Sequence, residues 1–362
     1  MSKPSDKTRL SRYRPDRKAF PDFQPSERHQ RILLLVHAHR FLDTELLWHL
    51  LRVSESETPA QGVKSGFGME ALYKALQKMF NAGYLNRHFL YDVPIGRGKG
   101  TPPTVYGLGT KSARLLSEVL GCSPRDIQDI VEANKVKTPF LRHALEIARF
   151  RVTLELACMA SGGEKKLLFW EQGQGLKETV TAFDAQGNER KFSVYPDAMF
   201  ALELEGKGRA CYFLEIDRGT MPIRATTERP DLIGKFIGYR KFREKKMMER
   251  KFGYRVLADG TVAGLAINER PFDDVEPPSG VKPIPGFNVL FVMPGSIDVE
   301  GKPKGRIRNC LAELMALGAA YSTSSLFWFT PPESYTIEEP KSILKNIWIT
   351  SNAGQGLQSL VE

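Results

Sequence analysis

The chain has 362 residues, of which 41% are hydrophobic, and a formal net charge of +10. This length predicts two or three domains, and the excess of lysine and arginine indicates a polyanionic partner, most often nucleic acid. No apolar stretch approaches the roughly 18 residues of a membrane-spanning helix, and the N-terminus is polar and basic. We therefore expect neither a membrane partner nor a signal peptide.

The four cysteines carry no metal or disulfide signal, because none is paired at C-x-x-C spacing. They are Cys122, Cys158, Cys211 and Cys310. Such a set argues against a zinc ribbon and a disulfide framework, and it fits a reducing compartment.

The first 28 residues contain eight lysines and arginines against four acidic residues, with four prolines. Few of them are apolar, so the segment cannot bury enough surface to fold by itself. We expect a disordered basic arm, which either touches nucleic acid or is a solvated tail.

Residues 29–120 resemble a winged helix-turn-helix domain. Apolar spacing and cap residues predict three helices, two strands and a further helix, at residues 27–41, 45–51, 69–81, 84–90, 105–108 and 111–120. In that fold the third helix enters the major groove of DNA and the loop between the strands contacts phosphates. The DNA contacts predicted in this way are Tyr73, Lys74, Gln77 and Lys78 on the third helix, with Arg97 and Lys99 on the wing. A winged helix that binds protein is the alternative.

The rest of the chain predicts a second domain of α+β class, with a mixed sheet and flanking helices. We expect a linker at 121–140, then this domain at 141–332, then a C-terminal tail at 333–362 with one short strand. Its elements are a helix at 141–159, a strand at 166–171, a hairpin, a helix at 231–251, a strand at 288–293, a helix at 306–317 and a strand at 325–330.

Three carboxylates lie on the predicted hairpin. A glycine-containing turn separates two apolar runs, and a hairpin centred near Lys207 places Asp197 opposite Asp217. Because side chains alternate along a strand and opposed residues share a face, Glu215 joins them on one face. Like charges this close need a positive partner or exposure to water. A metal ion that contacts a phosphodiester is one such partner.

The order of helix, strand, Pro-Asp strand, Glu-x-Asp strand and helix resembles the PD-(D/E)xK nuclease core. The resemblance implies that Asp197 and Glu215 hold Mg²⁺. A catalytic lysine is expected at the position of Asp217, so this chain departs from the pattern. Either Lys235 or Arg218 takes the lysine's place, or the domain does not cleave.

Further residues could complete or replace this site. Tyr239 lies one helical turn after Lys235, on the same face. Glu146 or Glu155 could add a metal ligand. The alternative for all the carboxylates is an exposed acidic patch, or an ion-paired cluster against Lys235 and Arg218.

A strongly basic segment follows the carboxylates. Residues 235–255 contain nine lysines and arginines and two acidic residues, interspersed with aromatic and aliphatic side chains. An amphipathic helix of this kind can lie along a phosphate backbone, with Lys241 and Arg243 as DNA contacts. A solvated surface helix is the other interpretation.

The pair His37 and His39 flanks one residue, a spacing that on a strand forms the metal site of HUH relaxases. The surrounding sequence is helical, and on a helix two residues spaced by two point about 200° apart and cannot share a metal. We therefore favour the helix-turn-helix interpretation.

Taken together, residues 28–330 resemble the replication-relaxation family of bacterial plasmids and other mobile elements. Besides the winged helix, the resemblance rests on the segments LRHALE (141–146), PDA (196–198), FLEIDRGT (213–220) and KFIGY (235–239). It implies a cytoplasmic bacterial protein that binds double-stranded DNA in replication, relaxation or mobilisation, as a homo-oligomer or with other replication or mobilisation proteins. The open alternatives are a Mg²⁺-dependent DNA endonuclease and a non-enzymatic regulator or scaffold.

Overall fold

The computed structural model describes residues 14–56, 68–90, 103–134, 138–184, 186–226, 229–248, 255–256, 262–263, 286–352 and 356–361. Within it the chain forms two compact units, Met1–Val152 and Thr153–Glu362. Both units mix helices with strands, so the chain is of the expected α+β class.

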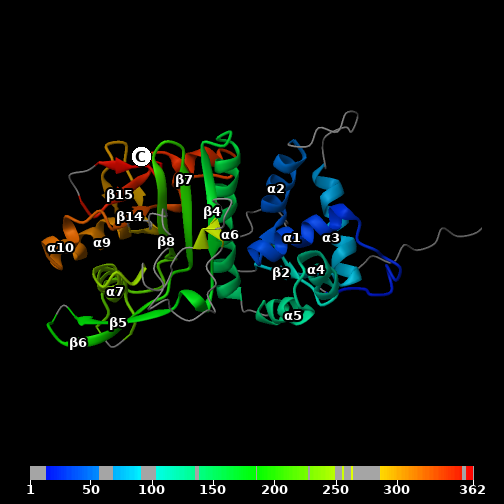
Figure 1. Cartoon of the computed structure of the whole chain (residues 1–362), viewed down its shortest axis with the longest axis horizontal. Helices are drawn as coiled ribbons and strands as arrows, with labels where there is room; N and C mark the ends of the chain where they lie inside the picture. Colours follow the sequence, from blue (N-terminus) through cyan, green and yellow to red (C-terminus); the bar gives the residue numbers. More distant parts are fainter. Residues whose placement is uncertain are drawn as a thin grey trace, which may run out of the picture. The chain divides into compact units, whose positions relative to one another are not determined.

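Unit 1 places helices around a small antiparallel sheet (Figure 1). Its three strands run in the order β1-β3-β2. The elements are α1 (Glu27–His39), β1 (Leu42–Asp43), α2 (Thr44–Ser56), α3 (Met69–Ala82), β2 (Leu85–Phe89), β3 (Thr104–Leu108), α4 (Ser112–Leu120) and α5 (Pro124–Ala133). The helices and strands expected before residue 120 are all present.

The end of α3 shows how local sequence sets an element's bounds. Leu72, Leu76 and Met79 recur at helical spacing and are fully buried. The helix ends at Gly83, which has a φ of 92° and donates its N–H to the carbonyls of Met79 and Phe80. Only glycine adopts this left-handed conformation at little cost, so the chain turns here directly into β2.

The expected linker at 121–140 is wrong, because it contains the helix α5. Ser123 caps α5, and the side chains of Ile127 and Val131 are buried against the unit. The prolines of this segment, Pro124 and Pro139, favour an irregular connection, which is why the sequence does not predict this ten-residue helix. Pro124 instead occupies the first turn of the helix, where its missing N–H costs nothing.

The long helix α6 (Thr138–Met159) crosses the boundary between the units, with residues up to Val152 assigned to unit 1. Within the described residues, no helix combines the length and the apolar content that crossing a membrane requires.

Unit 2 is built on a seven-stranded mixed sheet with the order β16-β15-β14-β11-β8-β7-β4 (Figure 1). Strands β8, β11 and β14 are parallel, and the other neighbours are antiparallel. The sheet strands are β4 (Lys165–Glu171), β7 (Ala198–Leu204), β8 (Gly208–Ile216), β11 (Asn288–Val292), β14 (Phe327–Thr330), β15 (Trp348–Thr350) and β16 (Leu357–Gln358).

Helices and short elements complete unit 2. They are η1 (Gln174–Leu176), β5 (Glu178–Phe183), β6 (Glu189–Val194), α7 (Leu232–Glu244), β9 (Arg255–Val256), β10 (Val262–Ala263), β12 (Ser296–Ile297), β13 (Pro303–Lys304), α9 (Gly305–Ala316), α10 (Ala319–Ser322), η2 (Pro332–Ser334) and η3 (Pro340–Leu344). Residues 333–362, expected as a tail with one short strand, contain that strand as β15 and add β16 to the sheet as well, and Trp348 is fully buried.

The two faces of the sheet carry different side chains. One face packs on α7 and α9 through a core that includes Phe213, Phe236, Phe291 and Phe327. The opposite face carries an aromatic row of Trp170, Phe200, Tyr212 and Trp328, with ring centroids 5.2 to 6.2 Å apart. Both faces are apolar, so the ends of the strands are where polar chemistry can be accommodated.

The β7–β8 hairpin differs in register from the expected one. Ala198 pairs with Leu214, which brings Asp197 level with Glu215 rather than with Asp217. The turn is centred on Gly206, which has a φ of 73°, and not on Lys207. The slip is of two residues, so each side chain keeps its expected face.

A second hairpin, β5–β6, was absent from the expected elements. It pairs Glu178 with Val194 and Phe183 with Glu189, and it packs on α7. Gly238 of α7 permits this approach, since a Cβ there would lie 3.2 Å from the Val194 side chain. The hairpin borders the candidate site described next.

Candidate active site at the ends of β7 and β8

Glu215 is a carboxylate buried in the sheet, with 2% of its surface exposed. Lys235 Nζ donates to its Oε2 at 2.5 Å, and the Tyr239 hydroxyl donates to its Oε1 at 2.6 Å. Both donors come from consecutive turns of α7, as the spacing of four residues predicts. The expected approach of Lys235 to the carboxylates is therefore present.

Burial controls the ionisation of this group. Burial raises the pKa of Glu215, and the positive charge of Lys235 and the two hydrogen bonds offset that effect only in part. Burial lowers the pKa of Lys235, but Glu215, Asp197 and Asp217 together outweigh it, so the net shift is upward. The pKa of Tyr239 is raised well above its usual value, first by burial and then by the Glu215 charge. Tyr239 therefore stays a hydrogen-bond donor.

Asp197 lies directly before β7, at the same edge of the sheet as the end of β8. Its Oδ2 accepts the backbone N–H of Ile216 at 2.7 Å, and its own N–H bonds to the carbonyl of Leu214. These two bonds fix it beside Glu215. Its negative charge contributes to the raised pKa of both Glu215 and Lys235.

Asp217 plays a different part from the expected one. Its Oδ2 pairs with Arg306 at the start of α9, and its Oδ1 accepts the N–H of Gly219 at 2.9 Å. Arg306 also donates to the carbonyl of Met221. The carboxylate thus ties the end of β8 to α9, and no group of three metal-ligating side chains forms among the residues that the structure describes.

The residues that remain at the site fit a magnesium ion in kind. Asp197 and Glu215 offer carboxylate oxygens, the hard donors that Mg²⁺ takes, usually one or two from the protein with water and phosphate completing the shell. Lys235 is the cation that contacts Glu215. In the described part of the chain, Glu146 and Glu155 join no group of metal ligands with them.

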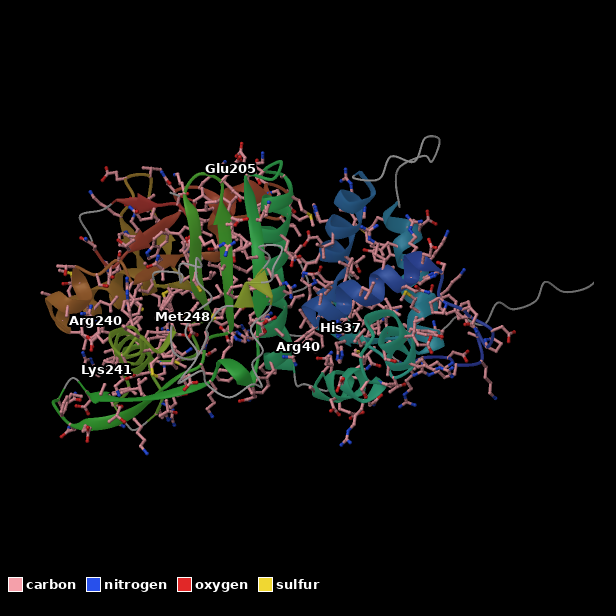
Figure 2. The ribbon with its side chains drawn as sticks, in the orientation of Figure 1. His37, Arg40, Glu205, Arg240, Lys241 and Met248 are labelled. Atoms are coloured by element: carbon pink, nitrogen blue, oxygen red, sulfur yellow. The ribbon has the colours of Figure 1, made fainter. Side chains whose placement is uncertain are left out.

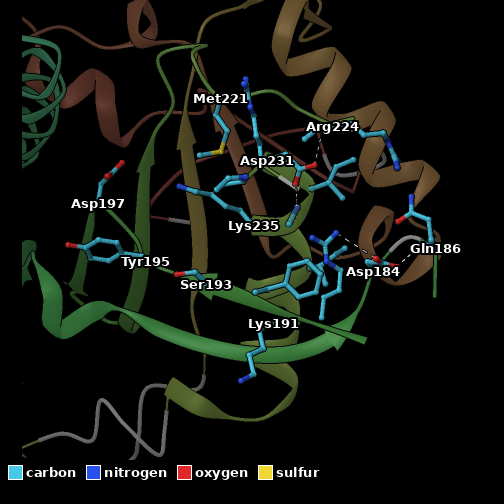
Figure 3. Close-up of a pocket in the computed structure, with 18 residues that line it drawn as sticks. Asp184, Gln186, Lys191, Ser193, Tyr195, Asp197, Met221, Arg224, Asp231 and Lys235 are labelled. Atoms are coloured by element: carbon cyan, nitrogen blue, oxygen red, sulfur yellow. Dashed lines mark hydrogen bonds and ion pairs between the residues drawn. The ribbon is translucent and has the colours of Figure 1, made fainter. Parts of the chain in front are cut away.

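A cavity of about 570 Å³ opens beside Asp197 and Lys235 (Figure 3). It lies between β6, the described residues 221–226 and 229–230, and the first turns of α7. Its charged lining residues are Asp184, Arg190, Lys191, Asp197, Arg224, Arg229, Asp231 and Lys235. The cations outnumber the carboxylates, which suits an anionic ligand.

Of these charged lining residues the sequence predicts only Asp197 and Lys235 as site residues, and the hairpin that carries Asp184, Arg190 and Lys191 is not predicted. The available signal was the turn at Asp184–Asn188, flanked by runs that alternate apolar and polar side chains. The contribution of Arg224 and Arg229 could not be found this way, because they lie in an irregular segment.

The DNA contacts predicted on α3 share one exposed face. Tyr73 is 54% exposed, and Lys74, Gln77 and Lys78 are also exposed. Lys74 pairs with Glu70 at 2.6 Å on the helix surface. The polar residue Asn81 at the end of the helix is by contrast fully buried, where its Oδ1 accepts the N–H of Asp16. Arg97 and Lys99 lie outside the described residues.

The basic helix is shorter than expected, since α7 ends at Glu244 and Lys246 has a φ of 52°, which no α-helix continues through. Lys241 pairs with Glu244 at 3.3 Å, while Arg243 is exposed. The Arg240 guanidinium donates to the carbonyl of Ala320 of α10. Figure 2 labels Arg240 and its neighbour Lys241 on α7. Part of the positive charge of α7 is therefore used within the unit.

His37 and His39 lie on α1, as the helical interpretation requires. His39 is buried, and its Nδ1 lies 2.9 Å from the carbonyl of Leu35. A strand-borne HUH metal site at these residues is thereby contradicted.

Comparison with protein-family models gives a match over most of the chain. The replication-relaxation family model matches residues 33–256, well over half of the chain. The chain therefore belongs to the replication-relaxation family, which suggests a role in the replication or relaxation of mobile elements. Comparisons with curated proteins and with solved structures found no match.

Proposed function

We propose that the protein binds the DNA of a mobile element and cuts one of its strands in the presence of Mg²⁺. Unit 1 would bind double-stranded DNA, and unit 2 would carry a PD-(D/E)xK-like cleavage site. The observation that carries the proposal is the contact of Lys235 with Glu215 beside Asp197, where Lys235 and Asp197 line a cavity whose cations outnumber its carboxylates.

Support for the DNA-binding part comes from the order of elements in unit 1. Three helices, with β1 before the second, are followed by β2 and β3 in one antiparallel sheet. This is the order of a winged helix, in which α3 would enter the major groove. The exposed face of α3 offers Tyr73, Gln77 and Lys78, which can contact base edges and phosphates.

Support for cleavage comes from the division of roles among three residues. Asp197 and Glu215 would hold Mg²⁺, which lowers the pKa of an attacking water and neutralises charge on the phosphate. Lys235 replaces the lysine expected at position 217 and supplies a positive charge beside the scissile phosphate. Tyr239 holds the Glu215 carboxylate in place from the buried side.

Supercoiled plasmid tests the proposal, because a single cut changes its topology. The wild type, Asp197→Ala and Glu215→Ala would each be incubated with Mg²⁺ or Mn²⁺. We expect nicking by the wild type alone, with duplex binding kept by all three. If none of them nicks while each binds DNA, the enzymatic proposal fails.

A non-enzymatic DNA-binding regulator or scaffold is the second candidate. Three contacts favour it, since Glu215 already has Lys235 and Tyr239 as partners, and Asp217 has Arg306. In that case the cluster would stabilise the sheet edge. The same plasmid assay then shows duplex binding without nicking.

A further inference from the structure

The strand β6 leads directly to Asp197. Lys191, Ser193, Tyr195 and Asp197 are spaced by two, so in extended chain they share one face. The first three are exposed, and Tyr195 keeps 38% of its surface in solvent. In Figure 3 the four residues follow one another along the chain toward the candidate site.

The other face of the hairpin holds this row in place. Val180 and Val194 are buried in the main core of unit 2, and Ala182 packs on Ile233 and Ile237 of α7. Within the described chain β6 pairs only with β5, so its second edge is open. Arg190 and Phe192 on one face of β6 and Lys191 and Ser193 on the other face all line the cavity. A cavity that contacts both faces of a strand runs along its edge, so we place it at the open edge of β6.

Two carboxylates of the cavity already have partners within the protein, whereas two of its cations have no carboxylate partner among the described residues. Asp231 is occupied, since its two oxygens accept the N–H groups of Gly234 and Ala225 at 2.7 and 2.8 Å. Asp184 accepts backbone N–H groups of its own turn and lies 3.8 Å from Arg190. By contrast, the structure gives no ion pair to Lys191 or Arg229 within the described residues.

We propose that this edge binds a single-stranded segment of DNA and delivers its backbone to Asp197. Delivery toward Asp197 rests on the cleavage function proposed above. The inference adds that the substrate of this site is a locally unpaired DNA strand. Lys191 and Arg229 contact phosphates, the Ser193 hydroxyl donates to a phosphate oxygen, and Tyr195 stacks on a base.

Two observations favour a single strand over a duplex. An aromatic face beside a cationic groove is how proteins bind unpaired strands, because every base then has an open face, whereas paired bases are stacked on one another. The cavity volume of about 570 Å³ also lies in the range of small-ligand pockets, so it suits a few nucleotide groups and not a double helix.

Binding without cleavage separates this inference from the proposed function. Anisotropy of a fluorescein-labelled thymidine oligonucleotide of about 15 nucleotides, and of a labelled duplex, would be measured for the full chain in EDTA. The variants are Lys191→Glu, Tyr195→Ala and Tyr195→Phe. The matched controls are Lys345→Glu and Phe183→Ala, an exposed lysine and an exposed aromatic that do not line the cavity.

We expect Lys191→Glu and Tyr195→Ala each to weaken single-strand binding about tenfold, with duplex affinity changed less than about twofold. Tyr195→Phe keeps its aromatic face and should bind like the wild type, as should both controls. Unchanged single-strand binding in Lys191→Glu and Tyr195→Ala would overturn the inference. An equal loss for single strand and duplex would overturn it too. Absence of plasmid nicking would leave these binding results standing and would count against cleavage alone.

Discussion

Lys235 of α7 donates a hydrogen bond to the buried carboxylate of Glu215 on β8, twenty residues earlier in the chain. Strands β8 and β11 are parallel neighbours, and α7 belongs to the connection between them. The ion pair therefore joins β8 to the helix that follows it. Asp197 lies level with Glu215, directly before the neighbouring strand β7. A cation and two carboxylates are thus held at one edge by regular secondary structure, which gives the site a rigid frame.

Removal of the Lys235 charge should destabilise unit 2 and make its stability more sensitive to pH. Lys235→Met leaves Glu215 buried without its cation, at a cost of about 3 kcal/mol near pH 8. The folded-state pKa of Glu215 already lies above its unfolded value and rises further in the variant. A raised carboxyl pKa means that the folded state binds the proton more tightly than the unfolded state does. Protonation of Glu215 therefore stabilises the folded state at low pH, and this stabilisation is lost as the pH rises through the folded-state pKa.

Urea unfolding at about pH 5 and pH 8 checks this prediction. We expect the deficit of Lys235→Met relative to the wild type to grow with pH. The double variant Lys235→Met with Glu215→Gln is the control, because a neutral amide removes the titration. A deficit that is equal at both pH values would contradict the buried-pair account.

The Tyr239 hydroxyl should contribute more to stability than an ordinary tyrosine hydrogen bond. Tyr239→Phe removes a donor to a buried carboxylate, and we expect a loss of about 2 kcal/mol in the free energy of unfolding. Tyr212→Phe is the matched control, since its hydroxyl donates to the neutral carbonyl of Leu360 at 2.9 Å. There the expected loss is about 1 kcal/mol. Equal losses in urea titrations would mean that the Glu215 charge adds nothing.

Asp217 should be structural and not catalytic. Asp217→Ala leaves Arg306 without its carboxylate, so the unfolding midpoint should fall by an amount equivalent to about 2 kcal/mol. Nicking activity at a temperature where the variant is folded should stay close to that of the wild type. If Asp217→Ala abolishes nicking while it remains folded, Asp217 belongs to the catalytic set after all.

Much of the frame could be predicted from the sequence because its signals are local. The spacing of Lys235 and Tyr239 places both on one face of a helix, and the alternation on β8 fixed the face of Glu215. The observed hairpin register differs from the predicted one by two residues. Because strand side chains repeat every two residues, the predicted face of Glu215 is still correct.

The remainder depends on contacts between distant segments. Arg306 reaches Asp217 across 89 positions, and no local pattern marks that pair. Asn81 has a polar side chain on a helix, yet it is buried because Asp16 supplies its partner. The β5–β6 hairpin is not predicted, because only Phe192 and Val194 are apolar in the strand Glu189–Val194, and its other four side chains are charged or polar.

Duplex binding should depend on the exposed face of α3. Lys78→Ala removes one phosphate contact, so we expect weaker duplex binding and a salt slope smaller in magnitude by about 0.9. Arg125→Ala, an exposed cation on α5 of the same unit, is the control and should change neither value. A salt slope for Lys78→Ala equal to that of the wild type would remove α3 from the interface.

The nicking rate of Lys235→Met on supercoiled plasmid with Mg²⁺ tests the central claim most directly. Duplex binding and a urea titration would first show that the variant is folded at the assay temperature. If Lys235 supplies the missing cation of the site, the wild type nicks the plasmid and the variant is slower by a factor of about 100 or more. A folded Lys235→Met that nicks at the wild-type rate would contradict the claim.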